Sequence, residues 1–157
     1  AMKSIRQSNI ENTISKFIKS GRLVVGICLG MQLLFESSVE FGDTSGLAVL
    51  KGKVSSLEKI NLNNNFKIPN IGWHKINYKK VLDDNFSEFD NQYMYFVHSF
   101  FVEPEEDISL FVTKLGNNFF SSSIHKNNVL GFQFHPEKSG IIGQNIYKKI
   151  IKLARSL

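Results

Sequence analysis

Cys28, His135 and Glu137 are the residues whose types and spacing point most directly to chemistry. Cys28 is the single cysteine, and it lies within Gly-x-Cys-x-Gly, residues 26–30, between an apolar run and a segment with helical spacing. Such a turn exposes the sulfur at a helix N-terminus, where the dipole lowers the thiol pKa and the Leu29 amide faces a developing oxyanion. We therefore expect Cys28 to be a nucleophile. An inert buried thiol is the alternative, because free cysteines are often buried.

His135 is the base that a cysteine nucleophile needs. It follows a strand-like run in GFQFHPEKS, residues 131–139, and Pro136 keeps it extended. Residues i and i+2 of an extended segment face the same side, so Glu137 can accept a hydrogen bond from one imidazole nitrogen while the other faces the thiol. A surface carboxylate paired with Lys138 is the alternative for Glu137. The chain shows no short cysteine–histidine ligand spacing, so we expect no metal site.

Two long helices and a series of strands must position these residues. The chain of 157 residues suits a single domain, residues 1–157. Apolar spacing predicts helices over residues 8–21, with a capping box at Ser8 and Glu11 and a stop at Gly21, and over residues 140–157. A buried strand at 23–27 and a helix from about 29 to 37 form the turn at the cysteine. Shorter strands are predicted near 47–50, 53–58, 74–78, 93–98, 109–115, 119–125 and 129–134.

The composition favours a globular cytoplasmic protein. The net charge is +5 and the lysines are scattered, so we expect neither a nucleic-acid face nor a membrane surface. The sequence contains no apolar run of the ~18 residues that span a bilayer. A single cysteine excludes an intrachain disulfide framework, which favours a reducing compartment.

The stretches GICLGMQLLFESS, residues 26–38, and GFQFHPEKS together resemble the class I (triad) glutamine amidotransferases. Between them, IPNIGW and YFVHSF follow the order of one branch, the glutaminase subunits of imidazole glycerol phosphate synthase. The resemblance implies an α/β, flavodoxin-like sheet with flanking helices. It also implies that glutamine is hydrolysed through a γ-glutamyl thioester, without a cofactor. The ammonia then passes to a synthase (cyclase) subunit in a heterodimer, in histidine biosynthesis.

Site roles follow from the resemblance by position. The cysteine is the nucleophile, the histidine is general base and then acid, and the glutamate orients the histidine. Gln32 would hydrogen-bond the substrate glutamine; the alternative is that Gln32 is an exposed helix residue. The backbone around Ser99 and Phe100, in VHSF (residues 97–100), would hold the α-amino and α-carboxylate groups of the substrate. The substrate-binding positions are Gln32, Leu29, Gly30, Ser99 and Phe100.

Gly72, Trp73 and Lys138 face the synthase if the resemblance holds. A half-buried core tryptophan is the alternative for Trp73. His74 stands where the branch has asparagine, which keeps a paralogous amidotransferase open, one that supplies ammonia for acetamidino sugars. A catalytically inactive interaction module is a further alternative, and labelling with a glutamine-analogue electrophile separates it from an enzyme.

The sequence before the cysteine is short for this family. Only 27 residues precede Cys28, whereas the family has further β-α units and a loop that supplies a second oxyanion amide. We expect a chain started at the internal Met2, with weak or absent turnover, since losing one oxyanion donor costs about 10²–10³ in rate. We also expect self-association through an uncovered sheet edge.

Overall fold

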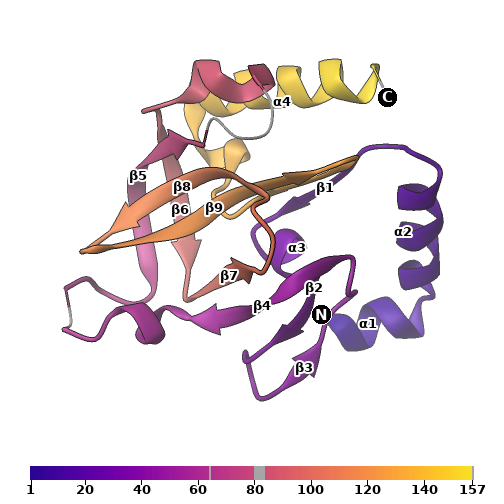
Figure 1. The fold of residues 1–157 in the computed structure, drawn as a ribbon, viewed down its shortest axis with the longest axis horizontal. Helices are drawn as coiled ribbons and strands as arrows, with labels where there is room; N and C mark the ends of the chain where they lie inside the picture. Colours follow the sequence, from indigo (N-terminus) through magenta and orange to yellow (C-terminus); the bar gives the residue numbers. More distant parts are fainter. Residues whose placement is uncertain (64, 80–83, 157) are drawn as a thin grey trace.

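A computed structural model describes residues 1–63, 65–79 and 84–156 (Figure 1). It contains a mixed sheet with helices at its sides, so the prediction of an α/β fold is confirmed. The helices are α1 (Met2–Gln7), α2 (Ile10–Lys19), α3 (Leu29–Gln32) and α4 (Gly140–Ala154), with 3₁₀ turns η1 (Leu57–Ile60), η2 (Asp84–Phe89) and η3 (Pro136–Lys138).

The strands form one ten-stranded sheet in the order β3-β2-β4-β7-β9-β8-β5-β6, and β10 joins β9 to β1. Only β1–β10 and β2–β4 are parallel among the described pairs, and the others are antiparallel. The strands are β1 (Val24–Ile27), β2 (Phe35–Ser38), β3 (Thr44–Ser45), β4 (Leu50–Ser56), β5 (Asn70–Tyr78), β6 (Tyr93–His98), β7 (Phe100–Pro104), β8 (Ser109–Leu115), β9 (Asn118–Lys126) and β10 (Val129–Phe132).

The pairing of β1 with β10 brings the two predicted catalytic stretches together. Ile27 lies opposite Phe132, so the cysteine and the histidine follow strands that end side by side. Among the described strands, β1 pairs with β10 alone and its other edge carries no strand. The expected pairing of that edge with a second copy stays a prediction.

Alternating side chains of β10 enter two different hydrophobic clusters. Leu130 and Phe132 join a cluster rich in phenylalanine, whereas Val129 packs with Met31 and Phe35 in the second. This alternation is the period of two that a strand covered on both faces requires. The strand that carries the histidine turn is therefore fixed from both sides.

The predicted helices at the two ends of the sequence are confirmed as α2 and α4. Gly21 follows α2 with a φ of +80°, as its predicted stop role requires. The capping box at Ser8 and Glu11 is wrong: Asn9 is the N-cap, and the Ser8 hydroxyl donates to the Ser4 carbonyl of α1, a helix that was not predicted.

The prediction of one helix over residues 29–37 is wrong. Helix α3 ends at Gln32, and the chain enters the sheet at Phe35 as β2, parallel to β4. The amides of Leu47 and Val49 donate to the carbonyls of Leu33 and Leu34. These bonds to a segment distant in sequence override the helical spacing of the apolar residues.

The remaining strand predictions hold with shifted bounds. Residues 47–50 and 53–58 were predicted as two strands and contribute to one, β4, while β5 begins four residues earlier than expected, at Asn70. Strands β3 and β7 were not predicted. Strand β7 leaves β6 after a single residue, Ser99, so the sequence between them contains no turn signal.

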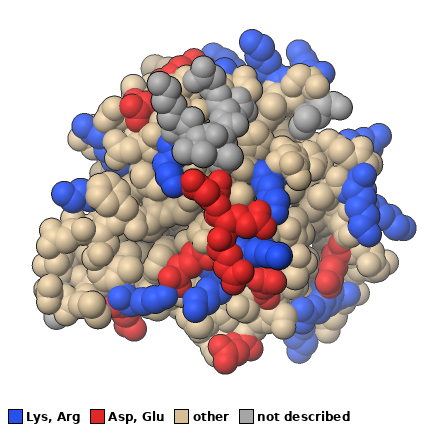
Figure 2. Space-filling view, viewed as in Figure 1, with Lys and Arg blue, Asp and Glu red and all other residues tan. Residues whose placement is uncertain are grey.

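Surface charge is mixed over the face in Figure 2, where acidic side chains gather near the middle and lysines and arginines lie scattered around them. Several of the acids pair with lysines, as Glu106 does with Lys126 and Asp107 with Lys79. Within the described part of the chain, none of the helices has both the length and the apolar character needed to cross a bilayer.

Candidate active site

Cys28 occupies a sharp turn between β1 and α3. Its φ of 50° and ψ of −109° lie where side chains are rarely found, as in a nucleophile elbow. The Cys28 amide donates to the Phe132 carbonyl at 2.7 Å, which ties the turn to β10. A Cβ at Gly26 would lie 2.6 Å from the Gly30 backbone, whereas a Cβ at Gly30 would meet open space. The tight turn therefore needs the first glycine and not the second.

The expected lowering of the thiol pKa is wrong for this arrangement. Burial raises the pKa of Cys28 above its usual value and outweighs the Leu29 amide and the Gln133 side chain, which both favour the thiolate. The thiol donates to the Val97 carbonyl at 3.9 Å and accepts from Gln133 Nε2 at 3.5 Å. Helix α3 has four residues, so its dipole is too small to offset desolvation.

His135 and Glu137 pair as predicted, by a different local geometry. Nδ1 of His135 lies 2.6 Å from Oε1 of Glu137. His135 is extended, as expected before Pro136, but Glu137 lies in the 3₁₀ turn η3 rather than in an extended segment. The turn folds the carboxylate back onto the ring. Burial disfavours the ionised carboxylate, yet the His135 hydrogen bond and the Glu137 amide together lower the pKa of Glu137.

Ser139 and Tyr147 support this pair, and the sequence did not identify them. Ser139 Oγ donates to the His135 carbonyl at 2.7 Å and accepts from the Tyr95 amide at 3.0 Å. The Tyr147 hydroxyl hydrogen-bonds Glu137, and burial together with that carboxylate raises the pKa of Tyr147. Tyr147 lies on α4, so only the packing of α4 could bring it to the site.

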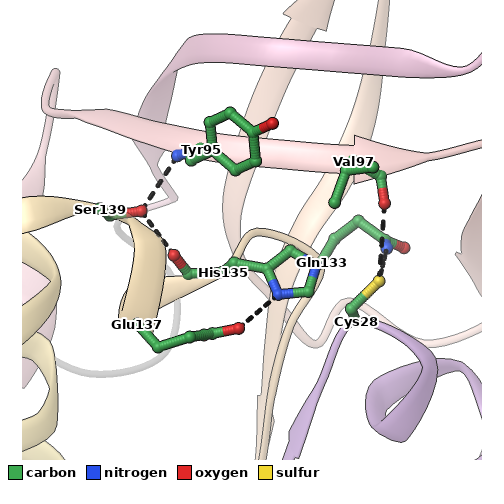
Figure 3. A network of polar contacts seen from close by, with 7 residues as sticks. All are labelled: Cys28, Tyr95, Val97, Gln133, His135, Glu137 and Ser139. Carbon is green, nitrogen blue, oxygen red and sulfur yellow. Dashed lines mark hydrogen bonds and ion pairs between the residues drawn. The ribbon is translucent and has the colours of Figure 1, made fainter.

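Figure 3 shows the His135 ring between Glu137 and Cys28, with Nε2 on the side of the cysteine. Nε2 is buried and has no hydrogen-bond partner among the described residues, Cys28 included. The structure therefore orients the base and leaves its second nitrogen available for a proton. The hydrogen bond between base and nucleophile is not formed here, because the thiol points to Val97 (Figure 3).

A cleft of about 730 Å³ opens over Cys28. Four of the five predicted substrate-binding positions line it, namely Leu29, Gln32, Ser99 and Phe100, whereas Gly30 does not. Glu40 also lines the cleft and is its only carboxylate within the described part of the chain. No sequence pattern singled out Glu40, which lies two residues after β2 and beyond the helix predicted for residues 29–37.

Gln32 is not an exposed helix residue. It is buried, and its Nε2 donates to the Phe100 carbonyl and to Gln133 Oε1, both at 3.0 Å. Gln133 is fully buried and bridges Gln32 to the sulfur of Cys28. The alternation of Gln133 with two phenylalanines was visible in the sequence, but its partners lie about a hundred residues away.

His98 is buried beside the cleft as a neutral imidazole. Its Nδ1 lies 2.8 Å from the Phe100 carbonyl and its Nε2 lies 3.0 Å from Asn70 Nδ2. Burial lowers the pKa of His98 to about 4, and the nearby His74 and His135 act in the same direction.

The predicted partner residues meet around Tyr95. Trp73 packs edge-on against the Tyr95 ring at 5.9 Å, and Lys138 Nζ lies 5.8 Å from the same ring. Trp73 is 53% exposed and belongs to neither hydrophobic cluster, which favours a surface position over a place in the core. Gly72 precedes it on β5 with a φ of +146°. His74 points the other way, packing edge-on against the buried Phe96.

Residues 4–152 match the protein family described as Glutamine amidotransferase class-I. The chain belongs to this family. It is 40% identical over 158 residues to the imidazole glycerol phosphate synthase subunit HisH of Aquifex aeolicus, covering 100% of this chain and 73% of that protein. The same subunit of Methanosarcina barkeri is 42% identical, covering 92% and 70%.

The fold of this amidotransferase family member has solved counterparts. A crystal structure of a glutamine amidotransferase superposes with a TM-score of 0.66 at 19% identity, covering 97% of this chain and 71% of that one. The predicted family and its α/β fold are therefore confirmed, and so is the resemblance to the glutaminase branch of imidazole glycerol phosphate synthase.

Proposed function

We propose that this chain hydrolyses glutamine at Cys28, with His135 and Glu137, and supplies the ammonia to a cyclase partner that forms imidazole glycerol phosphate. The observation that supports this most directly is the convergence of an elbow cysteine with an oriented histidine at one cleft, in a member of a glutamine amidotransferase family. The similarity to HisH subunits supports the choice of partner.

Acylation begins when His135 Nε2 takes the thiol proton and Sγ attacks the side-chain carbonyl carbon of glutamine. The carbon–sulfur bond forms and the carbonyl electron pair moves to oxygen, where the Leu29 N–H, already directed at the sulfur, stabilises the charge. His135 then gives its proton to the leaving nitrogen. The carbon–nitrogen bond breaks, ammonia leaves, and a γ-glutamyl thioester remains on Cys28.

Deacylation uses the same histidine for the opposite proton transfers. His135 takes a proton from water, the hydroxide attacks the thioester carbonyl, and the carbon–sulfur bond breaks to release glutamate. The thiolate recovers its proton from His135. Glu137 keeps Nδ1 protonated throughout, so Nε2 is the nitrogen that exchanges protons at each step.

The high pKa of the resting thiol fits this sequence of steps. Because Cys28 is a neutral thiol at physiological pH, it needs the imidazole to remove its proton at the moment of attack. Glu40 places a negative charge in the cleft where the α-ammonium group of an amino-acid substrate would be stabilised. Backbone of Ser99 and Phe100 is then left for the carboxylate end.

Labelling with a diazoketone analogue of glutamine tests this function. We expect one covalent adduct per chain, located on Cys28 by mass spectrometry and slowed by added glutamine. Cys28→Ser should give none, whereas the matched variant His125→Gln, altered on β9 away from the cleft, should label like the wild type. A folded wild-type chain that gains no adduct would contradict the proposal and favour an inactive interaction module.

The synthase partner is proposed to dock on one face of the β5–β6 ribbon. Side chains two residues apart on a strand share a face, so Ile71 and Trp73 of β5 lie with Tyr93 and Tyr95 of β6. Ile71, Trp73 and Tyr93 are all more than half exposed. Val97 lies on the same face, and its carbonyl contacts Cys28. The docking surface therefore borders the cysteine at which ammonia would be released.

Trp73→Ala tests the docking surface. We expect the affinity for the cognate cyclase subunit to fall about tenfold or more, measured by titration calorimetry, because interface tryptophans are frequent binding hot spots. Phe119→Ala is the matched control, since Phe119 is 59% exposed on the distant β8–β9 hairpin. Equal losses for both variants would argue against this surface.

We propose a cytoplasmic location, supported by the single cysteine and by the biosynthetic role of the similar subunits. The acetamidino-sugar paralogue loses support, because His74 does not lie on the proposed docking face.

A further inference from the structure

Two buried residues outside the triad, Asn70 and His98, begin a chain of hydrogen bonds that ends at the nucleophile. Asn70 contacts His98, His98 contacts the Phe100 carbonyl, and Gln32 contacts both that carbonyl and Gln133. Gln133 donates to the sulfur of Cys28. Asn70 and His98 are each less than a tenth exposed.

The Phe100 carbonyl lies in the middle of this chain of hydrogen bonds and determines which group donates in each of them. A carbonyl oxygen only accepts, so His98 must protonate Nδ1 and Gln32 must direct its NH₂ group to Phe100. A neutral His98 then has an unprotonated Nε2, which accepts from the Asn70 amide. The Phe100 oxygen thus receives two donors, one from each side.

The same logic determines which end of Gln32 meets the substrate. Both hydrogens of its NH₂ group are used, one by Phe100 and one by Gln133. Its Oε1 has no donor among the described residues, and Gln32 lines the cleft. The cleft therefore presents an amide oxygen, which accepts from a carboxamide NH₂ and repels a carboxylate.

We propose that Asn70 and His98 are positioning residues, which hold the Phe100 carbonyl so that Gln32 presents its oxygen to the substrate and selects glutamine over glutamate. This inference rests on the proposed function of the same cleft. His98 also lines the cleft, but the effect that we propose for it and for Asn70 passes through the Phe100 carbonyl and the Gln32 amide.

Two substitutions at His98 separate positioning from mere packing. In His98→Asn the new amide nitrogen stands where Nδ1 was and still donates to Phe100, whereas in His98→Gln the amide lies one bond farther and that donor is lost. We expect His98→Gln to slow Cys28 labelling by the glutamine diazoketone on the order of tenfold or more, and His98→Asn to stay within about threefold of wild type. Iodoacetamide alkylates Cys28 without glutamine recognition, so its rate should be the same in wild type and in both His98 variants. The control His125→Gln should leave the rates with both reagents unchanged.

Three other outcomes of these labelling experiments would overturn the inference. Equal loss with both reagents in His98→Gln would mean a general structural role, and equal loss in both His98 variants would mean that the Nδ1 donor does not matter. A wild-type chain that iodoacetamide alkylates but the diazoketone does not would refute the proposed function, and this inference with it.

The histidine tautomer gives a test that needs no variant. Nitrogen-15 spectra of the wild-type imidazole should show His98 protonated at Nδ1 near neutral pH. Protonation at Nε2 instead would leave two acceptors facing each other at Phe100 and would overturn the proposal even if every His98 variant failed to fold.

Discussion

At the scale of single residues, the elbow is a compromise between backbone strain and packing. Cys28 adopts a rarely populated backbone conformation, and such strain persists only where surrounding contacts over-determine it. Those contacts are the hydrogen bond from the Cys28 amide to the Phe132 carbonyl and the close approach of Gly26 to the Gly30 backbone. The two glycines that flank the cysteine look equivalent in sequence, yet they have different roles.

Gly26→Ala and Gly30→Ala should differ sharply. The new Cβ at residue 26 would lie 2.6 Å from backbone atoms that cannot move cheaply, so we expect a loss of at least about 2 kcal/mol in unfolding free energy and slower diazoketone labelling. At Gly30 the space is open and alanine favours the helix, so the change should stay within about 1 kcal/mol. Urea unfolding measures both. Similar losses in the two variants would contradict this account of the turn.

At the scale of elements, the site depends on where three strands end. Strands β1 and β10 place Cys28 and His135 next to each other, and β6 closes the site through Tyr95 and Val97. The His135 amide donates to the Tyr95 carbonyl at 2.9 Å, and the Ser139 hydroxyl bonds the Tyr95 amide on β6 and the His135 carbonyl at the start of η3. The base is therefore held by bonds between β6 and the η3 turn rather than by the triad alone.

Ser139→Ala should loosen that attachment. Its hydroxyl is almost fully buried and makes two backbone hydrogen bonds, so we expect a loss of about 1–3 kcal/mol in stability, since the Tyr95 amide loses the acceptor that it now uses. Turnover should fall more than substrate affinity does, because His135 shifts and the cleft does not.

Ser20→Ala is the control for Ser139→Ala. The Ser20 hydroxyl makes one exposed bond, to the Phe17 carbonyl at the end of α2, so its removal should change stability by less than about 1 kcal/mol. Denaturant titration and steady-state kinetics provide the measurements. Equal effects at the two serines would show that the hydroxyl of Ser139 does not hold the turn.

At the scale of the whole molecule, one aromatic cluster connects the site to the fold. The His98 ring packs against Phe96 and Phe120, and Phe96 in turn contacts Phe134, next to the base. The imidazole is thus part of the main hydrophobic core. Its protonation affects folding, because a charge in that position would have to be desolvated.

Stability should fall as the pH falls from 6.5 to about 4, owing to His98. The unfolded chain takes up a proton at the ordinary histidine pKa, whereas the folded chain does so only near pH 4, so acid stabilises the unfolded state over this interval and adds nothing further below it. The shift corresponds to about 3 kcal/mol at most.

Urea unfolding of wild type and His98→Phe at several pH values checks this effect. The variant should lose the contribution of His98 to the pH dependence between 4 and 6.5 and keep that of His74, whose pKa burial also lowers, whereas His125→Gln should retain both. An identical slope in wild type and His98→Phe would show that His98 is not the group responsible.

The sequence by itself determined the chemistry of the site. Cys28, His135 and Glu137 follow from residue type and spacing along short stretches, and α2 and α4 follow from apolar periodicity, because these signals are local. Only the tertiary structure decided what surrounds them. Residues 35–37 were predicted to end a helix, but strand pairing places them in β2, and Glu40, just after β2, lines the cleft. Burial raises the thiol pKa, and contacts between segments far apart in sequence form the bridge through Gln133 and the hydrogen bonds of His98. Local sequence patterns do not show which distant segments come into contact, so these features could not be predicted.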